Sequence, residues 1–250
     1  LLDLLAASRF PVVFLRPGTD LPAGADDARV CESLGPLVAA AAQRGLAVGL
    51  YSIPDVSGLA LSPQTARWLV AGPGGESIVA IKVTEVDYEA STARFLADPQ
   101  LGRLKIVQGW DPHILRALRD GPRFDPQGRQ RAGVTSGVMS LAVYQYRHIL
   151  DAAEQGDWNE VTQAQSAVNQ LFEAMQDDPN RFADLQRAKY VMGLGHPLTG
   201  KIEPEQVERI FAALERIARP ADRRRLARSL DLMGDGPFHN RLIALSEAAP

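Results

Sequence analysis

The chain has 250 residues, 46% of them hydrophobic, and its 27 Lys and Arg against 30 Asp and Glu give a net charge of −3. This balance argues against a nucleic-acid-binding protein or an anionic-membrane protein, because both classes usually carry a basic surplus. A chain of this length buries a large core without help from a disulfide or a metal. The single cysteine, Cys31, excludes an intrachain disulfide and fits a reducing compartment. No apolar run reaches the ~18–20 residues that span a bilayer, so we expect a cytoplasmic protein.

Short β-rich runs alternate with amphipathic stretches over the first part of the chain. The predicted strands are Phe10–Leu15, Leu46–Tyr51, Ile78–Val83, Leu104–Val107 and a weaker one near Gly133–Val138. Predicted helices lie between them, over Arg29–Arg44, Ser62–Val70 and Asp111–Arg119. Strands that are apolar almost throughout are typical of a parallel sheet or barrel covered by helices. The repeat of about 30 residues is the length that βα units require.

The pattern changes to helices alone after the last strand. Helices are predicted over 139–155, 158–176, 181–194, 204–218 and 221–233. We therefore expect a βα portion over residues 1–140 and a helical portion over residues 141–250. The run Arg223–Arg225 has no wider basic field around it, so we interpret it as the solvated face of a helix.

Lys82 interrupts the apolar strand IVAIKV near its C-terminal end. Strict alternation puts Ile78, Ala80 and Lys82 on one face of this strand. A lysine inside a barrel is partly desolvated, which favours the neutral amine that attacks carbonyl groups. Barrel enzymes gather their reactive groups at the C-terminal ends of strands. The alternative is a lysine that marks the strand end and extends into solvent.

Tyr51 closes the preceding strand and shares a face with the small residues Ala47 and Gly49. A phenol at this place can relay protons to and from a bound intermediate. The alternative is an aromatic plug at the rim of a barrel.

Five segments resemble, in order and spacing, motifs of the dihydrodipicolinate synthase and N-acetylneuraminate lyase family. The segments are YSIPDVSGLALSPQT at 51–65, IVAIKVTEVD at 78–87, LKIVQGWD at 104–111, GVTS at 133–136 and GDW at 156–158. The first two carry the family's tyrosine and lysine motifs, and the resemblance extends over residues 10–195.

This resemblance implies a (β/α)8 TIM barrel with a C-terminal helical extension and a class I lyase or aldolase. It implies that Lys82 forms a Schiff base with pyruvate or a related 2-keto acid, and that Tyr51 shuttles protons and orients the substrate carboxylate. The backbone of Gly133, Thr135 and Ser136 would line the pyruvate pocket. We expect no cofactor, no metal, no nucleic acid and no membrane to take part. Because members of the family usually form dimers or tetramers, the resemblance also implies a homodimer or homotetramer.

Three departures narrow the expectation. Val56 stands where the synthases have an arginine that grips a substrate carboxylate, which argues against a true dihydrodipicolinate synthase. Gly18-Thr19 replaces a tyrosine pair, one of which crosses to a neighbouring active site in the synthases. Ser52 is closer to the hydroxy-oxoglutarate aldolase branch of the family. Arg16 is a candidate to hold a carboxylate instead, against the more common alternative of an ordinary exposed arginine.

The family's upstream Gly-Thr-Thr motif has no counterpart, and on this alignment the chain starts just before the fourth strand. Five strands cannot close an eight-stranded barrel, so we expect the sequence to lack N-terminal strands, with a degenerate half-barrel as the alternative. A catalytically inactive paralogue that binds a metabolite or a partner is the alternative function. The enzyme forms an imine on Lys82 and the inactive paralogue does not, so imine formation distinguishes the two functions.

The four histidines lack metal-ligand spacing, so we predict no metal site. They are His113, His148, His196 and His239.

Overall fold

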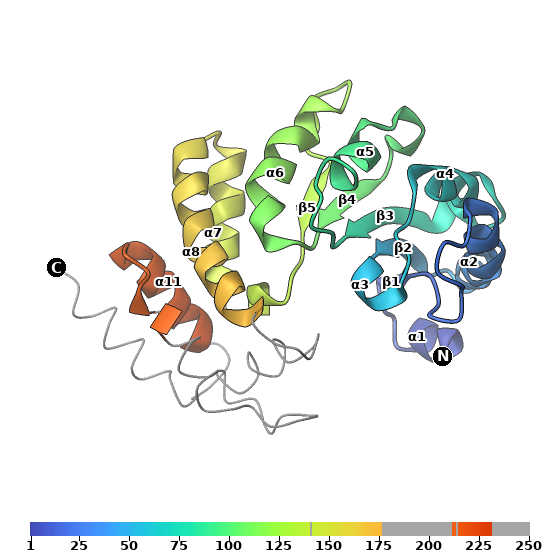
Figure 1. Ribbon diagram of the computed structural model, residues 1–250, viewed down its shortest axis with the longest axis horizontal. Helices are drawn as coiled ribbons and strands as arrows, with labels where there is room; N and C mark the ends of the chain where they lie inside the picture. Colours follow the sequence, from blue (N-terminus) through green and yellow to red (C-terminus); the bar gives the residue numbers. More distant parts are fainter. Residues whose placement is uncertain (141, 177–211, 214, 232–250) are drawn as a thin grey trace. The chain divides into compact units, whose positions relative to one another are not determined.

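The computed structural model describes residues 1–140, 142–176, 212–213 and 215–231 (Figure 1). The chain divides into two compact units, Leu1–Thr135 and Ser136–Pro250, and each is described by itself. The helix predicted over 181–194 and most of the one predicted over 204–218 lie outside the described residues.

The first unit is built on a five-stranded parallel sheet whose strands follow one another in chain order. The strands are β1 (Val12–Leu15), β2 (Ala47–Ser52), β3 (Ile78–Val83), β4 (Lys105–Gln108) and β5 (Ala132–Val134). All five predicted strands are confirmed in place, although β5 is shorter than the sequence pattern indicated. A parallel sheet in sequential order brings the C-terminal ends of all its strands to one edge.

Helices connect these strands. They are α1 (Leu2–Ala7), α2 (Asp27–Ala42), α3 (Pro54–Ser57), α4 (Pro63–Ala71), α5 (Thr92–Ala97) and α6 (Ile114–Arg123), with 3₁₀ turns at Gly75–Ser77, Pro99–Leu101 and Asp111–His113. Local sequence explains where two of them begin. The carboxylate of Asp26 accepts a hydrogen bond from the Arg29 amide at the start of α2, and the hydroxyl of Ser62 accepts one from the Thr65 amide at the start of α4. Such side-chain caps satisfy amides that have no partner within the helix.

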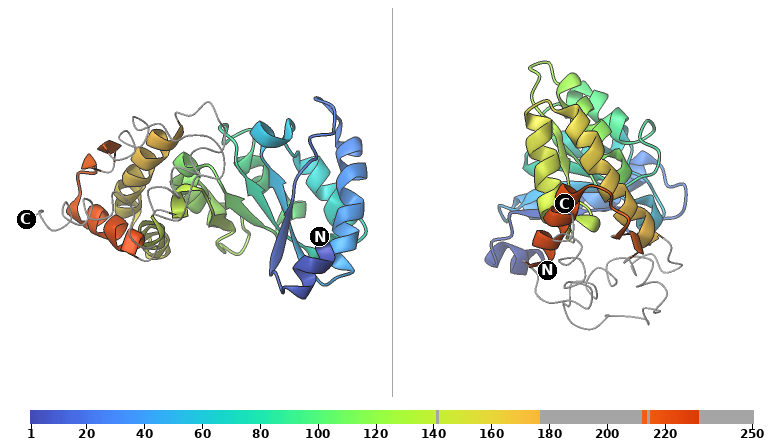
Figure 2. Two further views of the ribbon diagram at one scale, coloured as in Figure 1. Left: turned by 90° about the horizontal axis from the view of Figure 1, so that it is seen from below. Right: turned by 90° about the vertical axis from the view of Figure 1, so that its left-hand side faces the viewer.

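One face of the sheet packs against α2 and α4, and α2 runs alongside β1 and β2 (Figure 2). The buried aliphatic residues include Val48, Leu50, Ile81, Val83 and Ile106 from the strands, with Val30, Leu34, Val38, Ala66 and Leu69 from the two helices. Each buried Val, Leu or Ile side chain of this set stabilises the fold by ~1.5–3 kcal/mol through removal of its apolar surface from water. This core fixes the strands whose ends carry the candidate site.

A register shift in β3 corrects one expectation from the sequence. Val48 pairs with Ile78 and the next residue, Gly49, pairs with Ala80, so Val79 is an extra residue on β3. Ile78 consequently joins the helix-covered core, and it does not share the face of Lys82. A bulge of this kind breaks the two-residue period, which the sequence pattern alone does not reveal.

The second unit contains a 3₁₀ turn at Val138–Ser140 and the helices α7 (Val143–Glu154), α8 (Trp158–Gln176) and α11 (Pro220–Asp231). These confirm three of the predicted helices, and α7 packs against both α8 and α11 (Figure 1). The buried Gln145 donates a hydrogen bond to Asp222 at 2.9 Å and accepts one from Arg225 at 2.8 Å. The solvated-face interpretation is therefore wrong for Arg225, because buried acceptors on two helices hold its guanidinium. It holds for Arg224, which is exposed.

No helix within the described ranges is both long enough and apolar enough to cross a membrane.

Candidate active site

Four residues form a row across the C-terminal half of the sheet. Tyr51 pairs with Lys82, Lys82 with Val107, and Val107 with Gly133. We call these four residues the Lys82 row. None of them belongs to the core beneath α2 and α4, so the row lies on the opposite face of the sheet. Paired β-strands place such neighbours within reach of one another.

The amine of Lys82 lies over the aromatic ring of Tyr51. Its Nζ is 4.5 Å from the ring centroid, and both side chains are partly buried. A cation over a tyrosine ring is attracted by the ring quadrupole, with a stabilisation of ~0.5–2 kcal/mol that grows as the pair is desolvated. The contact brings together the two residues that the sequence singled out as candidate catalysts.

The phenol of Tyr51 has two further contacts. Its hydroxyl lies 3.2 Å from Oγ1 of Thr84 in a hydrogen bond, and its ring meets Phe14 edge-on at 6.3 Å between centroids. Gly49 makes this packing possible, since a Cβ there would lie 2.3 Å from the Phe14 ring. The hydroxyl is therefore directed along the sheet toward the segment that follows Lys82.

Gly109, which follows β4, leaves room for Lys82 and Thr84. A Cβ at this position would lie 2.1 Å from Oγ1 of Thr84 and 3.0 Å from Cε of Lys82. The amide of Gly109 donates to the carbonyl of Val83 at 2.8 Å, which ties this segment to the end of β3. A residue without a side chain is thus needed here for close approach.

A second polar pair joins β2 and β3 next to Tyr51 and Lys82. The hydroxyl of Ser52 donates to the carboxylate of Glu85 at 2.5 Å. Burial, partly offset by this hydrogen bond and reinforced by Asp87 and Asp55, raises the pKa of Glu85 above its ordinary value. The carboxylate is thus held in a place where its charged form is disfavoured.

The predicted substrate-binding residues differ in where they lie. Gly133 is part of the Lys82 row, and the Thr135 amide donates to the Gln108 carbonyl at 3.0 Å. Arg16 follows directly after Leu15 at the end of β1, and its guanidinium donates to the Pro17 carbonyl at 3.2 Å. Ser136 belongs to the second unit, where its hydroxyl is 2.9 Å from that of Tyr146.

Sequence reasoning missed Thr84 and Gly109 as parts of the site, and it gave Ser52 no role in it. Alternation was the available signal for Thr84, because residues two apart on an extended segment point to the same side. No local signal marks Gly109 or the pairing of Ser52 with Glu85, because both depend on which strand ends lie side by side.

Neither the histidines nor the cysteine of the described residues forms part of the candidate site. His113 hydrogen-bonds to the Val86 carbonyl at 2.7 Å, and His148 to Glu160 at 2.6 Å, whereas His196 and His239 lie outside the described residues. Burial, with the nearby Asp27 adding to it, raises the pKa of the Cys31 thiol. Among the described residues no group of three or more His, Cys, Asp or Glu side chains is placed to hold a metal ion.

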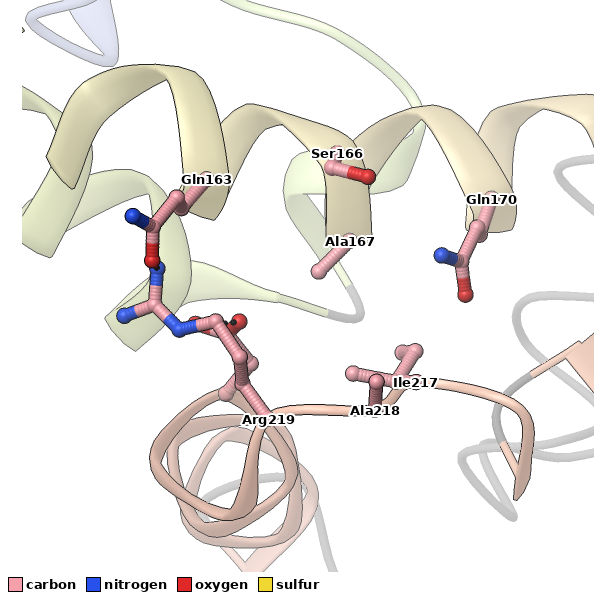
Figure 3. Close-up of a pocket in the computed structure, with 8 residues that line it drawn as sticks. Gln163, Ser166, Ala167, Gln170, Ile217, Ala218 and Arg219 are labelled. Carbon is pink, nitrogen blue, oxygen red and sulfur yellow. Dashed lines mark hydrogen bonds and ion pairs between the residues drawn. The ribbon is translucent and has the colours of Figure 1, made fainter. Parts of the chain in front are cut away.

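A cavity of about 200 Å³ lies in the second unit, between α8 and the segment that leads into α11 (Figure 3). Gln163, Ser166 and Gln170 line it from α8, and Ile217, Ala218 and Arg219 line it from the other side. The guanidinium of Arg219 donates hydrogen bonds to Gln163 at 2.9 Å and to Glu160 at 2.5 Å. None of the predicted site residues takes part in this cavity.

Tyr51 and Lys82 lie at the C-terminal ends of parallel strands, which is where barrel-type α/β enzymes carry their active-site residues. The sequence comparison then specifies the family. Residues 37–211 match the Dihydrodipicolinate synthetase family, so the chain belongs to it, and the predicted resemblance is confirmed. No curated protein matches the chain in a sequence search.

Solved structures support the same fold. A dihydrodipicolinate synthase matches with a TM-score of 0.66 and 15% identity, over 86% of this chain and 69% of that one. YagE of E. coli K12, a family member solved with pyruvate, matches with a TM-score of 0.69 and 15% identity, over 86% and 70%. A 2-keto-3-deoxygluconate aldolase variant of Sulfolobus solfataricus matches with a TM-score of 0.64 and 13% identity, over 86% and 68%. The predicted TIM-barrel class of α/β fold is confirmed.

Proposed function

We propose that this protein is a Schiff-base-forming lyase or aldolase that acts on pyruvate or a related 2-keto acid. Lys82 is the nucleophile and Tyr51 the proton shuttle. The observation that carries the proposal is the position of the Lys82 amine, 4.5 Å from the centroid of the Tyr51 ring. Membership of the Dihydrodipicolinate synthetase family supports the reaction class.

The chemistry requires a nucleophile and a group that moves protons. The neutral Nζ of Lys82 attacks the keto carbon, and loss of water leaves a protonated imine. In a 2-keto acid that carries a hydroxyl group on C4, cleavage of the C3–C4 bond places its electron pair in an enamine over C2 and C3 and releases C4 as an aldehyde. Tyr51 accepts the proton of the C4 hydroxyl and delivers a proton to C3 of the enamine, which restores the imine. Water then hydrolyses the imine, which releases pyruvate and regenerates the Lys82 amine. No electrons are gained or lost overall.

The remaining predicted residues hold the substrate in this proposal. Backbone groups of Gly133, Thr135 and Ser136 line the keto-acid pocket, and Arg16 holds a carboxylate. Val56 offers no charge to a second carboxylate, so an aldolase-type reaction is favoured over the synthase reaction. We also propose a cytoplasmic homodimer or homotetramer, in which residues 1–140 carry the chemistry and helix faces within residues 139–233 provide surfaces for self-association.

A catalytically inactive paralogue that binds a metabolite or a partner is the second candidate. It is favoured by Val56 and by Gly18-Thr19, which remove two polar features of the synthases. Under this proposal the Lys82 row binds a ligand without forming a covalent bond.

Trapping of the imine decides between the candidates. The protein is incubated with pyruvate and borohydride, and the modified peptide is located by mass spectrometry. We expect an adduct on Lys82 that is lost in Lys82→Met. Lys105→Met is the matched control, because Lys105 is an exposed lysine of the neighbouring strand, and it should keep the adduct. A folded, full-length wild-type protein without an adduct contradicts the enzyme proposal and supports the paralogue.

A further inference from the structure

Ser52 occupies the centre of a short chain of hydrogen bonds that the proposed reaction does not use. Its side chain is fully buried, and its Oγ accepts from the Leu61 amide at 2.8 Å. The same oxygen donates its single proton to Oε1 of Glu85 at 2.5 Å. Because the Leu61 amide can only donate, the proton of the Ser52 hydroxyl is left for Glu85, whose carboxylate is the acceptor in this chain.

These bonds close the loop that follows Tyr51. The loop begins after Ser52, the last residue of β2, and comes back to the Ser52 side chain at Leu61. The short helix α3 lies between these two ends. Inside the loop the Ser57 hydroxyl contacts the carbonyls of Ile53 and Leu59 at 2.8 and 2.9 Å, so the loop is held as a unit. The Ser52–Glu85 bond attaches this unit to the end of β3.

The same attachment lies beside the candidate catalysts. Ser52 follows Tyr51, and Glu85 follows Thr84, which is the hydrogen-bond partner of Tyr51. The Thr84 amide also donates to the Ser52 carbonyl at 2.9 Å. The ends of β2 and β3 are therefore joined by two side-chain bonds in succession, Tyr51–Thr84 and Ser52–Glu85, with a backbone bond between them.

We propose that Glu85 is a positioning residue, which acts through Ser52 to hold the end of β2 and so to orient Tyr51 beside Lys82. The proposal rests on the proposed function for its chemical consequence. Glu85 does not contact the reacting atoms. Glu85 affects the rate of proton transfer by Tyr51, because it fixes the position of the phenol. Imine formation by Lys82 does not require Glu85. The Glu85 carboxylate is partly buried, at a place that disfavours its charge. There it serves as a strong hydrogen-bond acceptor for Ser52.

Two readouts separate the roles of Lys82 and Tyr51. Borohydride trapping reports the imine, and exchange of the pyruvate methyl protons in D2O, followed by NMR, reports proton transfer at the enamine carbon. In Glu85→Ala we expect trapping on Lys82 to stay within about threefold of wild type and proton exchange to fall by ~10–100-fold, since small misplacements of a catalytic group cost this much. Glu85→Gln keeps an acceptor oxygen and should restore exchange to within about fivefold of the wild-type rate, the smaller loss expected when a weaker acceptor still fills the site.

The Ser52 variant and a matched acidic control complete the test. Ser52→Ala should lower exchange like Glu85→Ala, and the double variant should be no worse than either one, because the two residues act as a unit. Glu76→Ala removes an exposed carboxylate elsewhere in the first unit of the protein. It should leave both the trapping on Lys82 and the exchange of the methyl protons unchanged. Equal losses of trapping and exchange in Glu85→Ala, or exchange within threefold of wild type, overturn the proposal.

Hydrogen–deuterium exchange of the protein gives a readout that does not depend on activity. We expect the Leu61 amide to exchange faster in Glu85→Ala than in wild type, because its acceptor is no longer held. An unchanged Leu61 amide overturns the role of Glu85 whether or not pyruvate reacts. A wild-type protein that forms no adduct overturns the proposed function instead, so the two failures are distinguishable.

Discussion

The two faces of β3 differ in what their residues do. Ile81 is completely buried beneath the helices and belongs to the aliphatic core of the first unit. Its neighbour Lys82 lies on the other face, where it meets the ring of Tyr51. One peptide bond thus separates a residue that stabilises the fold from one that we assign to chemistry. The comparison teaches that stability and reactivity can be changed independently along this strand.

The largest effect on the reactive face is expected from Tyr51→Phe. The change removes the hydroxyl that bonds to Thr84 and keeps the ring beneath Lys82. We expect exchange of the pyruvate methyl protons to fall by ~10²–10⁴-fold, the usual contribution of a positioned acid or base. Thermal unfolding should change little, because one partly exposed hydrogen bond contributes about 1 kcal/mol. A variant that exchanges protons at the wild-type rate contradicts the role of Tyr51.

On the opposite face, Ile81→Ala should act on stability alone. Loss of a fully buried isoleucine costs ~2–5 kcal/mol in the free energy of unfolding, measured in urea. Per folded molecule, the yield of adduct on Lys82 should be unchanged. Val79→Ala is the matched control, since Val79 is 39% exposed and exposed substitutions stay within about 0.5 kcal/mol. A loss of trapping in folded Ile81→Ala would show that the two faces are coupled.

Gly109→Ala should affect both properties, because the new methyl group collides with Thr84 and Lys82. Overpacking of this kind costs ~1–3 kcal/mol of stability. It should also slow adduct formation, as Lys82 is displaced from the ring of Tyr51. Gly35→Ala serves as the control, since nothing lies within 4 Å of its Cβ and it sits in α2. Because Pro36 follows Gly35 in this helix and disfavours a side chain before it, we expect no gain in stability from this change and an unchanged yield of adduct.

The smallest effect is a dependence of stability on pH through Glu85. Its pKa is raised by burial above the ordinary value of 4.5, so the folded protein holds this proton more tightly than the unfolded chain does. The contribution of Glu85 to stability is therefore greatest below pH 4.5 and declines as the pH rises through the raised pKa. Glu85→Gln removes the decline.

Urea unfolding at several pH values tests this sign. The stability of Glu85→Gln relative to wild type should increase from pH 4.5 upward and then level off. A difference that is constant with pH, or that shrinks as the pH rises, contradicts the burial of a disfavoured charge at this position.

Strand positions and the Tyr51–Lys82 pair were predictable from sequence because each depends on local pattern or on motif spacing. The bulge at Val79 was not, because it depends on how β3 pairs with β2. The same reason applies to Gly109, whose neighbours come from another strand, and to Arg225, whose partner Gln145 is far away in sequence. Sequence pattern predicts what a segment prefers, and pairing between segments decides the contacts at the site.

The sequential order of the strands has a consequence for how the first unit folds. In the described sheet each strand pairs only with its neighbours in chain order, β1 with β2 alone and β5 with β4 alone, so no contact between these strands requires the closure of a loop across the whole unit. Pairing of consecutive strands limits each loop that must close to one βα segment, which costs less loop-closure entropy than pairing of strands from opposite ends of the unit. Tyr51 is synthesised before Lys82, and their contact is completed when β3 pairs with β2.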